Sequence, residues 1–344
     1  METSSKKLNI FFRTNFGTKV GLGHLIRCFK LANILKKKFN IFFVLDKKKE
    51  IVKVQDLIKD FNLIYLYEGN SKFRNEVLDA NLFIKKTENF KKFCVFVDDY
   101  RLASKWHIKI KKNVKKLIII DDLLSKKFYS DYYINYKYKI YQKSSIINKL
   151  NIKKNSKLIL GENFNILSNS LKKNQKRKYT MVNFGNSFDF KKIKGFLTAL
   201  YKYSIKNKMN LLICIGRFAK NTKYIFNFKQ TKYIKILNKE IFIENYLNQT
   251  KLFIGSAGAA VYEMSYLETP SIFFKTSNNQ SNEIDDLMDL GKFFYFTNYN
   301  NTENIFKLLN IFKKKEDRIK NLKLKKINLK NDGVKKILKI TKLL

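Results

Sequence analysis

The segment LNIFFRTNFGTKVGLGHLIRC, residues 8–28, joins an apolar strand to a helix through a turn that contains glycine. Gly21 and Gly23 let the backbone bend tightly and approach a ligand without a Cβ in the way. His24, one of two histidines in 344 residues, follows at the helix start, where free backbone N–H groups and the helix dipole favour anions. The segment therefore predicts a site at which an imidazole acts on a phosphorylated ligand.

Short apolar runs alternate with amphipathic helices along the chain, and the clearest helix covers residues 24–39. This alternation is typical of βα units built around a parallel sheet. In the first half we expect strands at residues 8–13, 41–45, 63–66, 94–97, 117–120 and 132–135. In the second half we expect strands at residues 179–184, 211–215, 234–237, 252–254 and 271–274.

A polar, basic stretch at residues 169–177 separates the two series of strands. We expect two Rossmann-like, doubly wound α/β domains, residues 1–171 and residues 178–344, that face each other across a cleft. Ligands of such folds bind at the carboxyl ends of the strands. The lysine-rich end of the chain, residues 313–344, alternates apolar and basic residues at helical spacing, which predicts packed terminal helices rather than a membrane-surface helix.

The net charge of +43 would ordinarily suggest nucleic acid or an anionic membrane surface as a partner. Here the lysines are spread along the whole chain. Asn, Ile, Phe and Tyr are also abundant, and all of these residue types have AT-rich codons, so genome composition accounts for the charge. Because no nucleic-acid-binding motif is recognisable, we expect no nucleic-acid partner.

The remaining composition indicates a cytoplasmic location. The three cysteines lie far apart in apolar segments, without CxxC spacing, and are expected to be reduced. No apolar run reaches the roughly 18 residues that a transmembrane helix requires, and the first residues lack the pattern of a signal peptide. We expect a monomer without a membrane span.

A dinucleotide cofactor is not expected. Ile26 stands where the GxGxxG pattern requires its third glycine, and the loop before Gly21 is long for that pattern. Asp46 does follow the second strand, as an acidic ribose ligand would. The broken pattern outweighs this match, so we expect no cofactor.

In the second half, GSAGAAVYE, residues 255–263, follows a strand and opens a helix. Small residues at this turn would leave backbone N–H groups open to a diphosphate, and Glu263 could accept hydrogen bonds from a ribose diol. The alternative is a helix start of small residues selected for close packing. The candidate ligand contacts are Ser256, Ala257, Gly258, Ala259 and Glu263.

Other strand ends carry polar residues that could face the same cleft. The acidic pairs at residues 98–99 and 121–122 could bind sugar hydroxyls or a metal, or could cap the following helices. No complete set of metal ligands is evident, so we expect no metal. Gly185 and Asn186 follow the first strand of the second domain, and Asn279 and Gln280 follow its fifth. His107 is interpreted as a surface or packing residue.

Taken in order, these segments resemble the UDP-sugar hydrolases of pseudaminic acid biosynthesis, which have the GT-B glycosyltransferase fold. The resemblance covers about residues 8–295, and it leaves the remaining tail unexplained. The matching segments are residues 12–13, 21–24 with Arg27, 31–32, 97–100, 121–122, 131–135, 161–167, 184–185 with Asp189, 256–263 and 279–280.

The resemblance implies hydrolysis of UDP-2,4-diacetamido-2,4,6-trideoxy-β-L-altropyranose at the anomeric carbon, with C–O cleavage, inversion and release of UDP. The catalytic histidine of the family corresponds to His24, and an imidazole can orient a water and take its proton. The turn at residues 256–259 would stabilise the leaving diphosphate, and Glu263 would bind the ribose. The other substrate contacts that we expect are Arg13, Asn15, Gly21, Gly23, Asp98, Tyr100, Gly185, Asn186, Asn279 and Gln280.

Two departures keep other functions open. Asn15 replaces an acidic residue that is usual in the family, and an extra residue precedes Asp189 in the turn after Gly185. The alternatives are a glycosyltransferase of the same fold that uses a UDP-sugar donor, and a non-catalytic binder of anionic ligands or nucleic acid.

Overall fold

The computed structural model describes residues 7–46, 49–68, 71–276, 284–296, 298–314 and 329–344. The chain forms two compact units, Met1–Ile166 with Asp332–Leu344, and Leu167–Asn331. The first boundary lies close to the expected one. The expected assignment of the last residues to the second domain is wrong, because Asp332–Leu344 belongs to the first unit.

The first unit contains a sheet of seven parallel strands in the order β3-β2-β1-β4-β5-β6-β7. All six strands that we expected here are present, and β7 is additional. The strands are β1 (Asn9–Thr14), β2 (Asn40–Leu45), β3 (Asn62–Tyr65), β4 (Cys94–Asp98), β5 (Lys116–Ile120), β6 (Tyr132–Asn135) and β7 (Lys157–Leu160).

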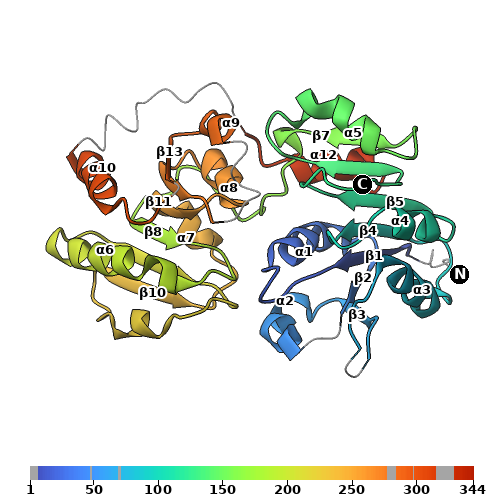
Figure 1. Cartoon of the computed structure of the whole chain (residues 1–344), viewed down its shortest axis with the longest axis horizontal. Coiled ribbons are helices and arrows are strands. Elements are labelled where there is room, and N and C mark those ends of the chain that lie inside the picture. The colour runs from blue at the N-terminus through green and yellow to red at the C-terminus, as the bar shows by residue number, and fades with distance from the viewer. Residues whose placement is uncertain (1–6, 47–48, 69–70, 277–283, 297, 315–328) are drawn as a thin grey trace, which may run out of the picture. The chain divides into compact units, whose positions relative to one another are not determined.

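Helices flank both sides of this sheet (Figure 1). The α-helices are α1 (Gly23–Leu35), α2 (Gln55–Ile58), α3 (Glu76–Thr87), α4 (Ser104–Lys111), α5 (Ser144–Leu150) and α12 (Gly333–Ile340). Short 3-10 helices are η1 (Lys49–Val54), η2 (Ile140–Lys143) and η3 (Glu162–Phe164).

Alternation along β1 sends neighbouring phenylalanines into two separate cores. Phe11 stacks on Phe42 with ring centroids 4.8 Å apart, whereas Phe12 stacks on Phe43 and Phe96. Successive side chains of a strand point to opposite faces, so both faces of this strand are apolar. Because both faces are buried, the strand has the continuous apolar sequence expected in a parallel sheet.

Helix α12 packs onto the first unit through its buried residues Val334, Ile337 and Leu338. Its first residue, Gly333, lies so close to the backbone of Asn165 that a Cβ there would fall 2.1 Å from the carbonyl oxygen. Lys116 Nζ also donates to the Thr341 carbonyl, at 2.6 Å. Over residues 332–344, the amphipathic pattern of the lysine-rich tail therefore contributes to the core of the first unit.

The second unit contains a six-stranded parallel sheet in the order β10-β9-β8-β11-β12-β13. The five expected strands are present, and β13 is additional. The strands are β8 (Tyr179–Asn183), β9 (Leu211–Ile215), β10 (Ile234–Asn238), β11 (Thr250–Ser256), β12 (Ser271–Phe274) and β13 (Phe293–Phe296). The helices are η4 (Phe190–Ile193), α6 (Lys194–Lys206), η5 (Lys223–Asn227), α7 (Glu244–Asn248), α8 (Ala260–Tyr266), α9 (Ile284–Met288) and α10 (Thr302–Lys314).

Both sheets reverse their strand order between two central strands, which is the point at which doubly wound folds bind ligands. In the first sheet this point lies between β1 and β4, where Thr14 pairs with Asp98. In the second it lies between β8 and β11, where Asn183 pairs with Gly255. The fold therefore places the candidate segments after residues 14, 98, 183 and 255 at the two switch points.

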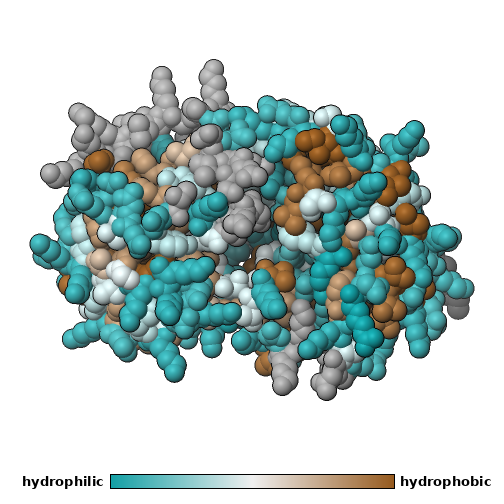
Figure 2. All heavy atoms as spheres, in the orientation of Figure 1, coloured by the Kyte–Doolittle hydropathy of each residue, from teal (hydrophilic) through white to brown (hydrophobic). Residues whose placement is uncertain are grey.

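Hydrophilic residues cover most of the surface seen in Figure 2, with apolar residues between them. All three cysteines are free and buried. No helix in the described ranges combines the length and apolar character needed to span a membrane.

Candidate functional site

A tight glycine turn places His24 at the carboxyl end of the first sheet. The backbone N–H of Gly21 donates to Gly17 O at 2.7 Å, and Gly17 N–H donates back to Gly21 O at 3.0 Å. Gly21 has a φ of +79°, a conformation that glycine adopts at little cost. Helix α1 then begins at Gly23, which is exposed and has open space where a Cβ would lie. The turn therefore directs His24 toward the strand ends while leaving the backbone accessible.

Asp98, the last residue of β4, orients the His24 ring. Its Oδ1 lies 2.5 Å from His24 Nδ1, and the carboxylate is fully buried. Burial alone would raise the pKa of Asp98, but the nearby Arg27 guanidinium and His24 ring lower it below its ordinary value. An ionised carboxylate only accepts hydrogen bonds, so we assign the proton of this contact to Nδ1, and Nε2 is then the ring nitrogen left to accept a proton. Asp98 is therefore an orienting residue, and the prediction that it contacts the sugar is wrong.

Arg27 also binds Asp98, with its Nη2 3.0 Å from His24 Nδ1, and it was missing from the expected site residues. Its Nε donates to Asp98 Oδ2 at 2.8 Å and its Nη2 to Oδ1 at 2.7 Å, a bidentate pair. Its Nη1 reaches Asp122 Oδ2 at 2.9 Å and Tyr136 Oη at 3.0 Å. Burial tends to lower the pKa of Arg27, but the Asp98 carboxylate raises it well above its ordinary value. The spacing of three residues from His24, on one helix face, could have indicated this partner.

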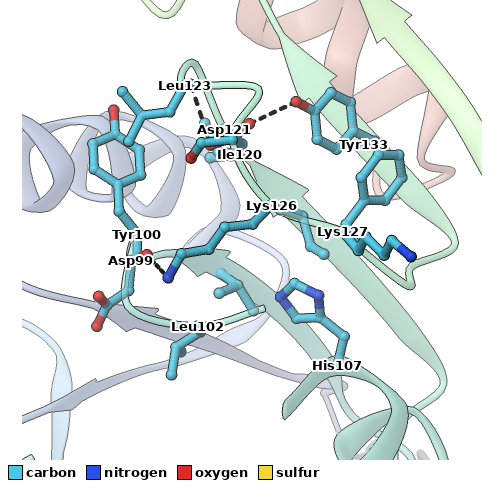
Figure 3. A pocket seen from close by; sticks show the side chains of 14 residues that line it. Asp99, Tyr100, Leu102, His107, Ile120, Asp121, Leu123, Lys126, Lys127 and Tyr133 are labelled. Atoms are coloured by element: carbon cyan, nitrogen blue, oxygen red, sulfur yellow. Dashed lines mark hydrogen bonds between the residues drawn. The ribbon is translucent and has the colours of Figure 1, made fainter. Parts of the chain in front are cut away.

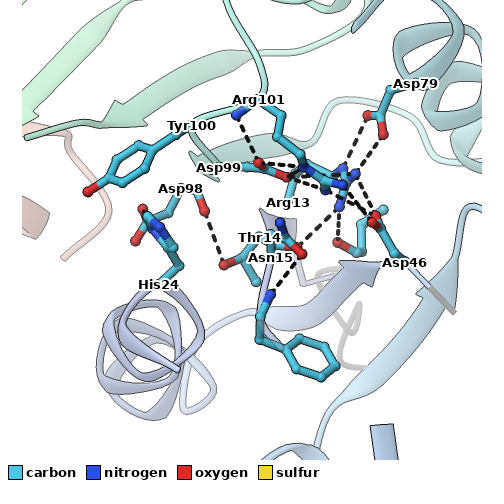
Figure 4. Close-up of polar contacts among 12 residues, drawn as sticks. Arg13, Thr14, Asn15, His24, Asp46, Asp79, Asp98, Asp99, Tyr100 and Arg101 are labelled. Atoms are coloured by element: carbon cyan, nitrogen blue, oxygen red, sulfur yellow. Dashed lines mark hydrogen bonds and ion pairs between the residues drawn. The ribbon is translucent and has the colours of Figure 1, made fainter. Parts of the chain in front are cut away.

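Tyr100 packs against His24, as expected for a residue of the same site. The two ring centroids are 4.3 Å apart and the planes meet at 84°, an edge-to-face contact. Figure 4 shows the His24 ring between Asp98 and Tyr100. The ring is therefore fixed by a hydrogen bond at Nδ1 and by a packing contact with an aromatic neighbour.

Arg13 is fully buried and lies in a separate cluster of charges (Figure 4). Its Nη2 donates to Asp79 Oδ2 at 2.6 Å and to Asp46 Oδ1 at 2.8 Å. Asp46 and Asp99 are also paired with Arg101, at 2.7 Å and 2.6 Å. The prediction that Arg13 contacts the substrate is therefore wrong, because its guanidinium is enclosed by partners inside the protein.

Asn15 is also buried, at 5% exposure. Its Oδ1 accepts the backbone N–H of Phe16 at 2.9 Å. At this position Asn15 supports the backbone that leaves β1 rather than presenting a charge beside His24. Its predicted contact with the substrate stays a proposal.

The candidate residues of the second unit gather at its own switch point. Gly185 has a φ of +81° and its N–H is held by Asn183 Oδ1 at 2.9 Å. A Cβ on Gly185 would lie 3.8 Å from Ser256 Oγ, so the turns that follow β8 and β11 are adjacent. Gly258 and Ala259 are exposed, Ala257 is buried, and Glu263 is half-buried on α8. Asn279 and Gln280 lie outside the described residues.

His107 lines a small pocket beside the ends of β4 and β5, together with Asp99, Tyr100, Asp121 and Lys126 (Figure 3). The pocket volume is about 30 Å³, which exceeds the roughly 10–15 Å³ that a cavity needs to hold a water. His107 is 2% exposed, and its Nε2 has no hydrogen-bond partner among the described residues. Its ring packs edge-to-face against the ring of Trp106, in agreement with a packing role.

We predict that His107 makes the first unit less stable in mild acid. Burial, with a smaller effect of Lys126, lowers the pKa of His107 from 6.5 to about 3. Between these values the unfolded chain binds a proton that the folded chain does not, so the free energy of unfolding falls as the pH drops below 6.5. At pH 4.5 the expected loss is about 2–3 kcal/mol relative to pH 7.5. The pKa of Asp98 is also lowered in the folded protein, but the loss of stability that results from its protonation occurs only at lower pH.

Urea unfolding followed by the fluorescence of Trp106 at pH 7.5 and pH 4.5 checks this prediction. His107→Gln should remove most of the pH-dependent change, whatever it does to stability at pH 7.5. Equal changes in the wild type and His107→Gln would show that other groups cause it.

Within the described ranges, no group of three or more His, Cys, Asp and Glu side chains has an arrangement that could hold a metal ion. The buried carboxylates of Asp79, Asp98 and Asp99 are paired with Arg13, Arg27 and Arg101, respectively. The described site around His24 consists of an imidazole, a carboxylate and a guanidinium within hydrogen-bond distance of one another.

Known proteins resemble this chain in fold. No family model matches the sequence, and no curated protein matches it. Among solved structures, the UDP-GlcNAc 2-epimerase from Neisseria meningitidis bound to UDP-GlcNAc has a TM-score of 0.58 at 12% identity, covering 97% of this chain and 99% of its own. The glycotransferase of kitacinnamycin has a TM-score of 0.56 at 9% identity, covering 97% and 99%. TcCGT1 in complex with UDP has a TM-score of 0.64 at 10% identity, covering 99% and 100%.

These similarities, with the two parallel α/β units, show that the chain has a GT-B-like fold. The expected fold class is confirmed. The similar structures include proteins that are named as UDP-sugar enzymes or that hold UDP.

Proposed function

We propose that this protein is an enzyme that hydrolyses a UDP-linked sugar, with His24 as the general base. The observation that carries the proposal is the His24–Asp98–Arg27 arrangement at the switch point of the first sheet. In general-base histidines, one ring nitrogen is hydrogen-bonded to a buried carboxylate and the other ring nitrogen accepts the proton from the nucleophile. The fold shared with proteins that hold UDP or UDP-GlcNAc supports a UDP-sugar as the substrate.

In the proposed reaction His24 Nε2 accepts a proton from a water molecule. The water oxygen forms a bond to the anomeric carbon as the bond from that carbon to the diphosphate oxygen breaks. The bonding electrons leave with UDP, and attack opposite the leaving group inverts the anomeric configuration. Asp98 stabilises the imidazolium that forms, and Arg27 keeps Asp98 in place through its bidentate pair.

We further propose that the second unit binds the nucleotide. Its turn at residues 256–259, which is exposed at Gly258 and Ala259, would lie along the diphosphate together with the neighbouring Gly185 and Asn186. Glu263 would accept hydrogen bonds from the ribose. The support is their convergence at the second switch point, where ligands of doubly wound domains bind. To neutralise developing negative charge with backbone N–H groups of this turn, the diphosphate would displace the donations of Ala257 N–H to Phe274 O and of Gly258 N–H to Ser256 O, at 3.4 Å and 3.0 Å.

The finer substrate proposal is UDP-2,4-diacetamido-2,4,6-trideoxy-β-L-altropyranose, and it rests on the sequence resemblance. Transfer of the sugar to an acceptor is the second candidate, because the chain shares its fold with a glycotransferase and His24 could deprotonate an acceptor hydroxyl as readily as water.

Release of UDP from this sugar nucleotide, measured in buffer without an acceptor, tests the proposal. We expect turnover without an acceptor. NMR spectra recorded early in the reaction should show a free sugar whose anomeric configuration is inverted relative to that of the substrate. Release that requires an added acceptor would identify a transferase. Saturable binding without release under either condition would identify a binding protein and contradict an enzymatic role.

A further inference from the structure

A second cavity lies in the Leu167–Asn331 unit, away from its switch point. Its volume is about 380 Å³, which is in the range of pockets that hold small molecules. It is lined by Thr180 and Leu252 at the starts of β8 and β11, and by Pro270 and Lys292 just before β12 and β13. The cavity is therefore at the amino ends of the strands, whereas the turn at residues 256–259 is at their carboxyl ends.

Strand β11 sets the distance between the cavity and the turn at residues 256–259. Lys251 lines the cavity, and Ser256 stands five residues further along the same strand. At about 3.3 Å per residue their backbones are roughly 16 Å apart. A small ligand in the cavity would therefore not occupy the proposed nucleotide site.

The lining has an apolar part and a cationic part. Leu252, Met209, Leu309 and Phe312 supply apolar surface. The lining contains one acidic residue, Glu268, and five basic residues: Arg177, Lys208, Lys251, Lys292 and Lys313. The Glu268 carboxylate is itself paired with Lys173, at 2.9 Å, and Lys173 is not part of the lining.

Two of these lysines have an explanation within the fold. Lys208 follows the end of α6 and Lys313 lies in the last turn of α10, where cations interact favourably with the helix dipole. That explanation does not apply to Lys251 and Lys292, which belong to strand starts. A hollow that joins apolar surface to an excess of positive charge is complementary to a ligand with both properties.

We propose that this cavity binds an amphipathic anion, a small molecule with an apolar or aromatic body and a phosphate or carboxylate group. Burial is the main reason that the pKa values of Arg177 and Lys292 lie below their ordinary values. Arg177 is exposed as a residue and its guanidinium donates to the carbonyls of Leu267 and Glu268, whereas Lys292 is half-buried. An anion beside Lys292 would offset the cost of its partial burial. The contact of the apolar body with Leu252 and Phe312 would supply the remaining affinity.

Isothermal titration calorimetry on the full-length protein tests the proposal with decyl phosphate, 1-naphthyl phosphate and decanoate, each below its critical micelle concentration. Inorganic phosphate is the charge-only comparison. We expect saturable binding of at least one amphiphile, at least tenfold tighter than that of inorganic phosphate. The preferred head group and body then distinguish a phosphate from a carboxylate and an aromatic from an aliphatic ligand.

Matched variants distinguish binding in the cavity from the general attraction of anions to a basic protein. Lys208→Glu combined with Lys313→Glu should weaken binding at least tenfold. Lys202→Glu combined with Lys206→Glu makes the same change in charge on exposed residues of α6 outside the lining, and should weaken it less than twofold. Met209→Trp should also weaken binding, by filling the cavity without a change in charge.

Three results would overturn the proposal: no saturable binding of any amphiphile, binding of inorganic phosphate as tight as that of the amphiphiles, or equal losses in the two double variants. Thermal unfolding of each variant shows whether it retains the fold. These outcomes are independent of UDP release, so the proposed enzymatic function can fail or succeed separately.

Discussion

Replacing His24 with alanine is expected to reduce UDP release from the UDP-sugar at least about a hundredfold, because a positioned general base contributes typically 10²–10⁴-fold. The loss should appear in kcat, with little change in KM, since the proton is transferred only in the transition state. The fold should survive the substitution. Arg27 still bonds both oxygens of the buried Asp98 carboxylate, so no unpaired charge is left behind.

The second histidine provides the matched control. His107 is buried beside Trp106 and lines a small pocket whose lining does not include His24. His107→Gln should therefore keep most of the turnover at pH 7.5, where its effect on stability is smallest. Initial rates of UDP release by both variants and the wild type make the comparison. Turnover of His24→Ala within threefold of the wild type would contradict a general-base role for His24.

All eleven expected strands are present, and they include every interior strand of both sheets and two of the four edge strands, β3 and β10. The interior strands are apolar along most of their length because most of their residues are buried. The two that were missed, β7 and β13, are edge strands of four residues with mixed burial. An edge strand packs on fewer neighbours, so its sequence carries a weaker apolar pattern than that of a central strand.

The functional roles at the strand ends depended on register, which the sequence does not give. Arg13 and Thr14 are neighbours in the chain but point to opposite sides of the sheet. Arg13 therefore meets Asp79, 66 positions away. His24 and Asp98 were expected in one site. Their direct contact, with His24 as the proposed base and Asp98 as the carboxylate that orients it, depends on the register that sets Thr14 beside Asp98.

The same burial that removes Arg13 from the substrate makes its partner Asp79 important for stability. Asp79 is fully buried and accepts hydrogen bonds from Arg13 Nε and Nη2. It also accepts from Tyr67 Oη at 2.9 Å and Trp106 Nε1 at 2.9 Å. Asp79→Ala would leave these buried donors without their acceptor. We expect it to lower the free energy of unfolding of the first unit by about 3–5 kcal/mol, as when one partner of a buried ion pair is removed.

Trp106 makes this prediction measurable in the first unit alone, because it is the single tryptophan of the chain and belongs to that core. With a urea dependence of about 2 kcal/mol/M, the fluorescence midpoint should fall by roughly 2 M. Asp60→Ala removes an exposed carboxylate that lies 3.8 Å from Lys36 Nζ. It should cost less than about 1 kcal/mol, as is usual for surface pairs. If the two alanine variants shifted the midpoint equally, the buried cluster around Arg13 would not stabilise this unit more than a surface pair does.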